Sequence, residues 1–491
     1  MVVTVDGHSL TLDSTVDVAE HSATVKANPA SLRRMEKFRA LLEERLARGE
    51  VVYGVNTGFG SLSGKVVSPG NLAHLQLNLI RSHSAGVGEE MPTEVVRAAM
   101  LIRLNSLLNG NSAARKEVAE LLVGMLNKGV TPLVPRFGSL GASGDLIPSA
   151  HMALAMVGEG KAYLGGKLKD SAKALSSSGL KPIELQAKEG LSLINGTAFT
   201  SALGCVSVQR GRLLLDAADS ALSLTAEALG ACSQSFDARL IGVKLDAGQR
   251  FVARQVRAFL NGSSRIRAEP VPQDPYSIRC APQVHGAVKD ALEFAAKVTV
   301  NEINSVSDNP VLTEDGAVLH GGNFHAQPVA LALDQLALAL SYLGVISLAR
   351  THFLLASTPS EAKYLASNPG LESGLMILEY TATALAAENA KEIHPESAYP
   401  ASVSGGIEDH ASHGVNAGMK ALSVLNNVSR ILAVELICAS NTLGSNIGGA
   451  SDHTEKACAF LRARSPLLTG DRSQGAEIEL VATDIMAGSL P

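Results

Sequence analysis

Residues 325–357 read HAQPVALALDQLALALSYLGVISLARTHFLLAS, and apolar side chains recur through this stretch with few helix breakers. That pattern predicts one long α-helix. A membrane span needs about 18 uncharged residues. Asp334 interrupts the apolar part, Val329–Ala349, and leaves Gln335–Ala349 as its longest charge-free run. We therefore expect a helix buried in a protein core, and no membrane partner.

Other long segments with the same apolar periodicity occupy much of the chain. Long helices with few breakers favour a helical bundle over alternating strands and helices. Hydrophobic residues make up 46% of the sequence, aromatic residues 4%, and Trp is absent. Ala, Leu, Val and Ile must therefore fill the core, which again favours packed helices. The further segments are 199–233, 284–306, 370–391 and 414–441.

The first part of the chain has a more mixed character. Asn28 and Pro29 are typical of a helix start, and Gly49 ends the apolar periodicity that follows. Val51–Tyr53 is predicted to be a short strand, and glycine-centred turns predict hairpins at 161–169 and 311–320. The predicted fold class is thus mainly α. A smaller mixed N-terminal domain spans residues 1–200, and a long-helix bundle domain spans residues 201–491.

Charge and cysteine content exclude several classes of protein. The net charge is −5 with no long basic stripe, so nucleic acid is not an expected partner. The five cysteines are scattered without a CxxC pair, which indicates a reducing compartment, here the cytoplasm, and no zinc ribbon. The opening residues, MVVTVDGHSLTLDS, lack a basic region followed by an apolar run, so no signal peptide is expected.

Common catalytic motifs are incomplete in this sequence. Leu62 occupies the nucleophile position in GSLSG, and Val66 follows Gly64-Lys65 where a phosphate-binding loop needs Ser or Thr. His410 and His413 follow two acids and form a possible metal cluster, although a polar loop facing solvent or substrate is the preferred interpretation, and no metal is expected. The surrounding stretch, 388–414, is rich in Pro, Ser, Gly and His, which is typical of a functional loop.

A run of small residues beside one acid suggests unusual chemistry. It lies in GSLGASGDLIPSAHMAL, residues 138–154. Gly144 has no side chain, so its amide nitrogen can approach the carbonyl carbon of Ala142 and close a five-membered ring. Loss of that carbonyl oxygen as water, and of the Ser143 hydroxyl as a second water, leaves an exocyclic methylidene, an electrophile made from backbone. Asp145 can serve the proton transfers. The competing interpretation is an ordinary turn before a helix.

With its neighbours, this segment resembles the signature of the aromatic amino acid ammonia-lyases, the methylidene-imidazolone enzymes. The resemblance covers almost the whole chain and implies a fumarase/aspartase-like architecture. It also implies that Ala142, Ser143 and Gly144 form the electrophile autocatalytically, with no external cofactor. The further matching blocks are YGVNTGFG (53–60), LQLNLIRSHSAGVG (75–88), LINGT (193–197), QDPYSIRCAPQV (273–284), SDNPV (307–311), GGNFHAQPVA (321–330) and EDH (408–410).

Within the family, Ser82-His83 and Glu408 resemble the histidine-specific branch, which implies conversion of L-histidine to trans-urocanate and ammonia. Members acting on tyrosine or phenylalanine usually carry Gln at the position of Glu408, and a tyrosine aminomutase branch can share Ser82-His83. The alternatives are therefore a tyrosine or phenylalanine ammonia-lyase or aminomutase, and, in another class, a helical scaffold protein whose small-residue run is only a turn. Three positions depart from the expected pattern: Arg81, Gln327 and Ile407.

The resemblance also implies roles for individual side chains. Tyr53 and Tyr276 are the candidate general bases, and because an ordinary tyrosine has a pKa of about 10, the acting one needs surroundings that favour phenolate. Arg279 is expected to hold the substrate carboxylate through its two-pronged guanidinium. His83 and Glu408 are expected to face the imidazole, which offers one donor and one acceptor.

Three other residues complete the predicted site. Asn195, Gln273 and Phe324 stand at family positions that line the electrophile. Asn195 is expected to donate a hydrogen bond to the ring carbonyl, and Phe324 to exclude water. The family is also known for homotetramers whose active sites draw on three subunits, so Tyr53, Ser143 and Glu408 need not come from one chain.

Overall fold

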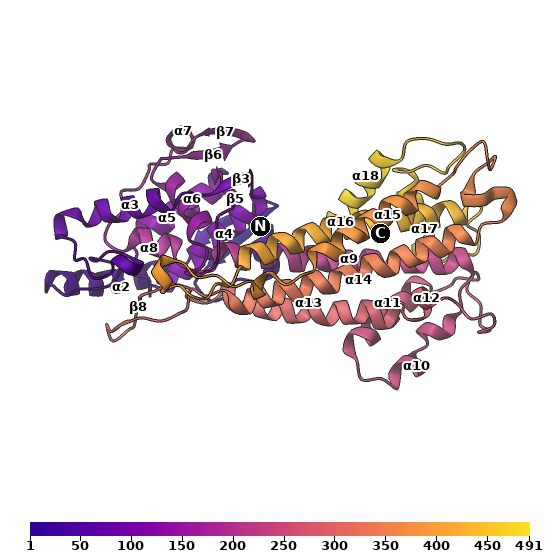
Figure 1. The fold of residues 1–491 in the computed structure, drawn as a ribbon, viewed down its shortest axis with the longest axis horizontal. Helices are drawn as coiled ribbons and strands as arrows, with labels where there is room; N and C mark the ends of the chain where they lie inside the picture. The colour runs from indigo at the N-terminus through magenta and orange to yellow at the C-terminus, as the bar shows by residue number, and fades with distance from the viewer. The chain divides into compact units, whose positions relative to one another are not determined.

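The computed structural model describes residues 1–491, apart from the side chain of Ser61, and most of the chain is helical (Figure 1). It divides into two compact units. Unit 1 contains Met1–Gln209, Ala295–Leu333 and Pro395–Met419, and unit 2 contains Arg210–Phe294, Asp334–His394 and Lys420–Pro491. The sequence suggested a single division near residue 200. The structure instead returns two later segments to unit 1, because the chain changes unit within four long helices: α9 (Ala198–Leu229), α13 (Ala281–Ile303), α14 (Gln327–Ala356) and α16 (Gly414–Leu443).

The core of unit 1 forms around α4 (Thr93–Leu108), whose residues are buried on every side from Val95 onward. It packs against α1 (Leu12–Ala19), α5 (Lys116–Lys128) and α2 (Pro29–Ala47). A fully buried helix must satisfy its polar side chains internally. Arg97 does so by donating a 2.7 Å hydrogen bond to the carbonyl of Val18.

The start of α2 confirms the prediction made from Asn28 and Pro29. The Asn28 side chain accepts a 2.8 Å hydrogen bond from the amide of Ala30, and Pro29 occupies the first helical position. The predicted strand at Val51–Tyr53 is wrong. Asn56 accepts a hydrogen bond from the amide of Val52 and donates one to the carbonyl of Glu50. These bonds engage backbone groups that a neighbouring strand would otherwise pair.

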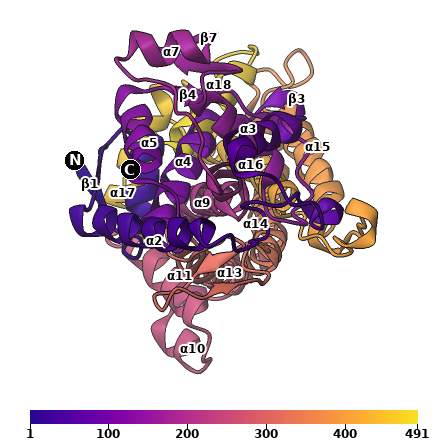
Figure 2. The same cartoon turned by 90° about the vertical axis from the view of Figure 1, so that its left-hand side faces the viewer.

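The strands form small peripheral sheets. Strand β1 (Val2–Val5) pairs in parallel with β2 (Thr24–Ala27), and β3 (Val87–Glu90) is antiparallel to β5 (Pro135–Phe137). Both predicted hairpins are present. The first is formed by β6 (Lys161–Leu164) and β7 (Lys167–Asp170), with β4 (Thr131–Pro132) beside β6, and the second by β8 (Val311–Leu312) and β9 (Val318–Leu319). Strand β7 and the short helix α7 (Ser171–Ser177) lie at the outer edge of unit 1 (Figure 2).

Three further helices of unit 1 pack against one another near the candidate site. They are α3 (Leu72–His83), α6 (Leu146–Met156) and α8 (Glu189–Ile194). The helix α3 ends on His83, and α6 begins directly after Asp145. The residue after α8 is Asn195. Three of the predicted functional segments therefore lie at the ends of mutually packed helices.

Unit 2 is a helical bundle. Its parts of α9, α13, α14 and α16 run side by side (Figure 1). An apolar cluster including Leu222, Val252, Ile278 and Ile346 joins α9, α13 and α14 to smaller helices. The remaining helices of unit 2 are α10 (Ala238–Gly242), α11 (Ala247–Phe259), α12 (Tyr276–Arg279), α15 (Met376–Glu392), α17 (Asp452–Arg462) and α18 (Gly475–Met486).

Two helices, α14 and α16, are long and apolar enough to cross a membrane by length and composition alone. In their most apolar windows, 72% and 78% of the residues are buried within the protein. Burial of this extent is what a core helix requires, and it agrees with the prediction made from residues 325–357.

Candidate active site

A cavity of about 1180 Å³ lies in unit 1. Its walls come from the loop after Tyr53, the end of α3, the small-residue turn, the end of α8, the segment 309–325 and the loop 404–410. These segments are distant in the sequence but meet around one space. The sequence-predicted residues that line it are Tyr53, His83, Ala142, Ser143, Asn195, Phe324 and Glu408.

The small-residue turn is shaped by glycines that no other residue can replace without strain. Gly144 has φ +76° and pairs with Gly196. A Cβ atom on Gly144 would lie 2.3 Å from the carbonyl oxygen of Gly196, and one on Gly196 would lie 1.9 Å from the carbonyl oxygen of Ser307. Three backbone segments therefore approach one another at distances that only glycine permits.

Ser143 is held through both its side chain and its backbone. Its hydroxyl donates a 2.7 Å hydrogen bond to Oε1 of Glu408. Its carbonyl accepts a 2.9 Å hydrogen bond from the side-chain amide of Asn195. The Oδ1 atom of Asn195 is buried and has no hydrogen-bond partner among the residues that the structure describes.

These contacts fit an electrophile built from residues 142–144. In the predicted ring, the Ser143 carbonyl is retained as the ring carbonyl, and it already has a donor in Asn195. The Ser143 hydroxyl, which ring formation would remove, faces the cavity wall at Glu408. Gly144 has no side chain to obstruct its amide nitrogen, and ring closure requires that access.

Asp145 is buried behind the turn, and its carboxylate is engaged by the start of α9. Oδ2 accepts a 2.7 Å hydrogen bond from the amide of Thr200, and Oδ1 accepts one of 2.8 Å from the Thr200 hydroxyl. Burial raises the pKa of Asp145 to about 6, against the opposing effects of the Thr200 bonds and the charge of Arg103. Asp145 thus joins the turn to the first turn of a long helix.

The geometry of His83 defines its tautomer. Its Nδ1 lies 2.9 Å from the carbonyl oxygen of Leu79, and because a carbonyl only accepts, Nδ1 carries the hydrogen. Burial lowers the pKa of His83, although the bond to Leu79 and the charge of Glu408 act in the opposite direction. Burial therefore favours the neutral imidazole, whose Nε2 is a hydrogen-bond acceptor.

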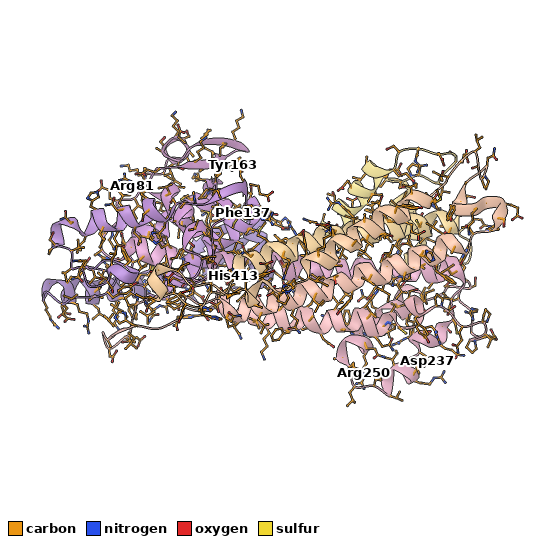
Figure 3. All side chains as sticks on the ribbon, in the orientation of Figure 1. Arg81, Phe137, Tyr163, Asp237, Arg250 and His413 are labelled. Carbon is orange, nitrogen blue, oxygen red and sulfur yellow. The ribbon has the colours of Figure 1, made fainter. Side chains whose placement is uncertain are left out.

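Glu408 reaches Ser143 because two distant loops pair through their backbones. The amide of His413 donates a 2.8 Å hydrogen bond to the carbonyl of Leu140, and the amide of Val403 donates one of 2.9 Å to the carbonyl of Glu408. His413, labelled in Figure 3, also meets the ring of Tyr399 edge-on. The predicted functional loop at 388–414 is thus attached to the small-residue turn.

Tyr53 lies half-buried in the cavity wall. Its hydroxyl oxygen accepts a 3.2 Å hydrogen bond from the backbone amide of Gly60. The ring also meets His320 edge-on, with 5.9 Å between the ring centroids.

Two functional candidates, His320 and His325, were missed from the sequence. Both line the cavity together with His410. His325 and His410 stack with 5.4 Å between centroids, and Nε2 of His325 is buried without a hydrogen-bond partner in the described part of the chain. The signal was present, since these histidines stand inside or beside the blocks GGNFHAQPVA and EDH. Among the described residues, no group of three or more His, Cys, Asp or Glu side chains is arranged to hold a metal ion.

A buried ion pair supports the wall of the cavity. Nζ of Lys188, just before α8, lies 2.6 Å from Oδ2 of Asp308, and both side chains are fully buried. Asp308 precedes Asn309, which lines the cavity. The pair therefore joins the segment leading to Asn195 to the SDNPV block, a relationship that the sequence does not reveal.

Gln273, Tyr276 and Arg279 lie in unit 2 and line a different pocket, of about 490 Å³. The guanidinium of Arg279 donates a 2.7 Å hydrogen bond to Oε1 of Gln273 and lies 4.8 Å from the centre of the Tyr276 ring. Tyr276 is 71% exposed. The structure therefore brings these three residues together in a pocket of unit 2. None of them lines the unit 1 cavity.

The three positions that depart from the expected pattern differ in their surroundings. Arg81 lies on the outer side of α3 (Figure 3), where it forms a 2.6 Å ion pair with Glu159. Ile407 lines the unit 1 cavity. The Oε1 atom of Gln327 is buried and unpaired among the side chains that the structure describes. Only Ile407 of these three lies in the cavity wall.

A mainly helical fold with a glycine-framed Ala-Ser-Gly turn in a cavity is the arrangement expected of an ammonia-lyase. A family model for aromatic amino acid lyases matches residues 10–463. The chain belongs to the aromatic amino acid lyase family. Its enzymatic class is accordingly that of the ammonia-lyases, which break a carbon–nitrogen bond, and its fold is of the fumarase/aspartase-like all-α class.

Known proteins resemble it over nearly the whole length. A histidine ammonia-lyase of Symbiobacterium thermophilum is 44% identical over 494 residues, covering 99% of this chain and 96% of the relative. The crystal structure of histidine ammonia-lyase from Trypanosoma cruzi is 38% identical with a TM-score of 0.92, covering 100% of this chain and 94% of that one. Tyrosine aminomutase from Streptomyces globisporus is 35% identical with a TM-score of 0.94, covering 99% and 97%.

Proposed function

We propose that this lyase eliminates ammonia from L-histidine and releases trans-urocanate. The observation that carries the proposal is the presence of Glu408 and His83 in the same cavity as Ser143. The Glu408 carboxylate and Nε2 of His83 are both acceptors, and an imidazole ring donates to one of them when neutral and to both when protonated. A phenyl ring has no such donor and would leave both half-buried acceptors facing an apolar ring, which is energetically costly.

Ala142, Ser143 and Gly144 are proposed to form the methylidene-imidazolone by closure of the Gly144 nitrogen on the Ala142 carbonyl carbon, with loss of two waters. Once formed, this group supplies an electron-withdrawing electrophile, which no ordinary side chain provides. The hydrogen bond from Asn195 to the Ser143 carbonyl supports the assignment. Asn195 would hold the ring carbonyl, and Phe324 would limit the access of water.

Tyr53 is the preferred general base for the β-proton of the substrate. Its ring lines the same cavity as Ser143, and its hydroxyl oxygen accepts the amide hydrogen of Gly60. Tyr276 remains the second candidate, because it stands beside the proposed carboxylate-binding residue Arg279. Replacement of each tyrosine by Phe distinguishes them, since loss of the base lowers kcat far more than loss of a substrate contact.

A homotetramer is proposed, with Arg279, Gln273 and Tyr276 of a neighbouring copy completing each cavity. Their surroundings support an interface: Leu240, Val243, Leu245 and Val271 are 56%, 81%, 88% and 79% exposed, and large exposed apolar side chains mark protein contacts. Arg279 would then grip the substrate carboxylate in two-pronged fashion. The amino acid substrate is the only small-molecule partner proposed.

Subunit complementation tests this sharing. Ser143→Ala and Arg279→Ala variants should each be inactive alone, and light scattering should report a tetramer for both. If the two residues serve one site from different copies, co-expressed mixtures should recover up to roughly a quarter of the activity, because random assembly leaves that share of sites intact. Absence of recovery from mixed tetramers would place both residues in one copy.

The substrate is tested by offering L-histidine, L-tyrosine and L-phenylalanine to the purified enzyme. Urocanate should appear in the near-ultraviolet from histidine, with little product from the other two. Ser143→Ala should abolish turnover of every substrate, and its intact mass should lack the two-water loss of the wild type. Faster turnover of tyrosine, or a β-amino acid product, would reject the proposal.

A tyrosine or phenylalanine ammonia-lyase or aminomutase is the second candidate. It is favoured by the similarity in fold to tyrosine aminomutase, with a TM-score of 0.94. Glu408 argues against phenylalanine, for the reason of unpaired acceptors given above, whereas the phenol of tyrosine has an O–H donor and is decided by the substrate comparison. A cytoplasmic location is also proposed, because all five cysteines, four of them buried, are free thiols and free thiols persist in reducing compartments.

A further inference from the structure

Four helices of unit 2 each contribute one side chain to a buried polar network. Asp219 comes from α9, His285 from α13, Arg350 from α14 and Glu435 from α16, and all four are fully buried. The proposed reaction uses none of them. Burying four ionisable side chains is costly unless each is paired, so their arrangement requires a reason.

Arg350 is the centre of this network. Its Nε and Nη2 donate hydrogen bonds of 2.6 and 2.9 Å to the two carboxylate oxygens of Glu435. The hydroxyl of Thr225 adds a 2.8 Å bond to the same carboxylate. This two-pronged pairing compensates both charges and fixes the plane of the guanidinium.

His285 occupies the opposite side of Arg350 as a neutral imidazole. Burial and the charge of Arg350 lower its pKa well below the usual value. Its Nε2 lies 3.4 Å from Nη1 of Arg350 and its Nδ1 lies 2.6 Å from Oδ1 of Asp219. Because Arg350 only donates, Nε2 is the acceptor and Nδ1 carries the hydrogen that faces Asp219.

The network reaches the segment that carries Tyr276 and Arg279. Nη1 of Arg350 also donates a 3.3 Å hydrogen bond to the carbonyl oxygen of Ser277, within α12. Ser277 and Ile278 are 9% and 1% exposed, whereas Tyr276 on the same short helix is 71% exposed. The inner side of α12 therefore rests on Arg350 and on the apolar cluster around Ile278, while Tyr276 extends outward.

The residues before α12 are held separately. Oδ2 of Asp274 accepts a 2.7 Å hydrogen bond from the amide of Cys232, and its other oxygen pairs with Arg267. A helix of four residues has little stability of its own. Its orientation must therefore come from these anchors.

We propose that Arg350 is a positioning residue for the reaction: by joining Glu435, His285 and the Ser277 carbonyl, it sets the orientation of α12 and so of Arg279 and Tyr276. Lysine cannot replace it, because one ammonium cannot present a planar fork to Glu435 and a further donor to Ser277. A buried ion pair is weak evidence for stability. We therefore assign the Arg350–Glu435 pair the role of orienting α12. This inference rests on the proposed function, in which Arg279 binds the substrate carboxylate.

Arg350→Lys is the principal test, with Arg350→Met as the more severe variant. Two competitive inhibitors are compared: imidazolepropionate, which has a ring and a carboxylate, and imidazole, which has only the ring. Losing a charge-assisted hydrogen bond costs about tenfold or more in affinity. The inhibition constant for imidazolepropionate should rise by about that factor in Arg350→Lys, while that for imidazole changes less than about twofold.

A matched control separates orientation from general destabilisation. Leu461, in α17 of unit 2, is 1% exposed, so Leu461→Ala should lower the melting temperature by creating a cavity. Its two inhibition constants should keep the wild-type ratio. The intact masses of all variants should retain the two-water loss, because Ala142–Gly144 belongs to unit 1.

An unchanged ratio of the two inhibition constants in folded Arg350→Lys would overturn the proposal, even if Arg350→Met fails to fold. An equal ratio change in Leu461→Ala would also overturn it. If the wild type instead turns over tyrosine or phenylalanine, the proposed substrate is wrong. Phenylpropionate and phenol then take the places of the two inhibitors, and the comparison still tests Arg350.

Discussion

The side-chain amide of Asn195 donates a 2.9 Å hydrogen bond to the backbone carbonyl of Ser143. The helix α6, the β6–β7 hairpin and the helices α7 and α8 separate the two residues along the chain. The contact gives the carbonyl of Ser143 a fixed donor inside the cavity, at the position where the proposed electrophile would keep its carbonyl. The following predictions concern this turn and the residues that hold it.

Asn195→Ala should lower kcat/KM for histidine by about 10- to 100-fold, since it removes one donor to a polarised carbonyl. Asn195→Asp should be worse, because a carboxylate oxygen would face the carbonyl oxygen of Ser143 and repel it. Steady-state kinetics with intact-mass measurement checks both. Equal activity of the two variants would contradict a donor role.

Glu408→Gln should reduce kcat/KM for histidine by about 10- to 100-fold, the cost of exchanging a charged acceptor for a neutral amide. Turnover of phenylalanine should change far less, because its ring has no hydrogen-bond donor. The ratio of the histidine effect to the phenylalanine effect is the quantity to measure. A uniform loss for all substrates would indicate that Glu408 acts through Ser143, to which it is hydrogen-bonded.

Gly196→Ala should destabilise the protein by about 3 kcal/mol or more, because overpacking and strained backbone both oppose the new side chain. Its Cβ would lie 1.9 Å from the carbonyl oxygen of Ser307, at φ +131°. If Gly196→Ala folds, its intact mass should show that the two waters of ring formation are lost from only part of the protein. Gly475→Ala is the control: nothing lies within 4 Å of its added Cβ, so its stability should change by less than about 0.5 kcal/mol.

Asp145 should make stability fall as the pH rises through about 6. An aspartate ionises near pH 3.9 in an unfolded chain, whereas the pKa of Asp145 in the folded protein is about 6. The folded state therefore binds this proton more tightly, and the stabilisation is complete below about pH 4 and lost above about pH 6. The shift of about two pKa units corresponds to roughly 3 kcal/mol.

Asp145→Asn should remove this dependence. Relative to the wild type, its free energy of unfolding should rise by up to about 3 kcal/mol between about pH 4 and pH 7, measured by urea unfolding. Asp237→Asn is a contrasting control on the surface of unit 2 (Figure 3). Bonds with Arg239 lower the pKa of Asp237 to about 2, so this variant should show no such gain. A constant difference for Asp145→Asn across the range would contradict the prediction.

Local features of the chain were predictable from the residues alone. The helix α2 begins at Pro29 after its Asn28 cap, and α14 covers most of the predicted 325–357 helix. Both follow from periodicity and capping, which act over a few neighbouring residues. The need for Gly144 was equally local, because ring closure involves only adjacent residues.

Only the tertiary structure decided which distant residues meet. Glu408 lies 265 positions from Ser143, and no local pattern predicts that the amide of His413 pairs with the carbonyl of Leu140. The same limit explains the error at Val51–Tyr53, where the side chain of Asn56 takes the backbone hydrogen bonds.

The chain's sequence by itself thus determined its helices, its family signature and the chemistry available at Ala142–Gly144. The packed structure alone decided that Tyr53, His83 and Glu408 surround Ser143, that His83 presents an acceptor, and that Gln273, Tyr276 and Arg279 belong to unit 2. The physical reason is the distance along the chain over which the interactions act. Secondary structure arises from neighbouring residues, whereas a site depends on long-range backbone pairing and close packing, which only the complete fold specifies.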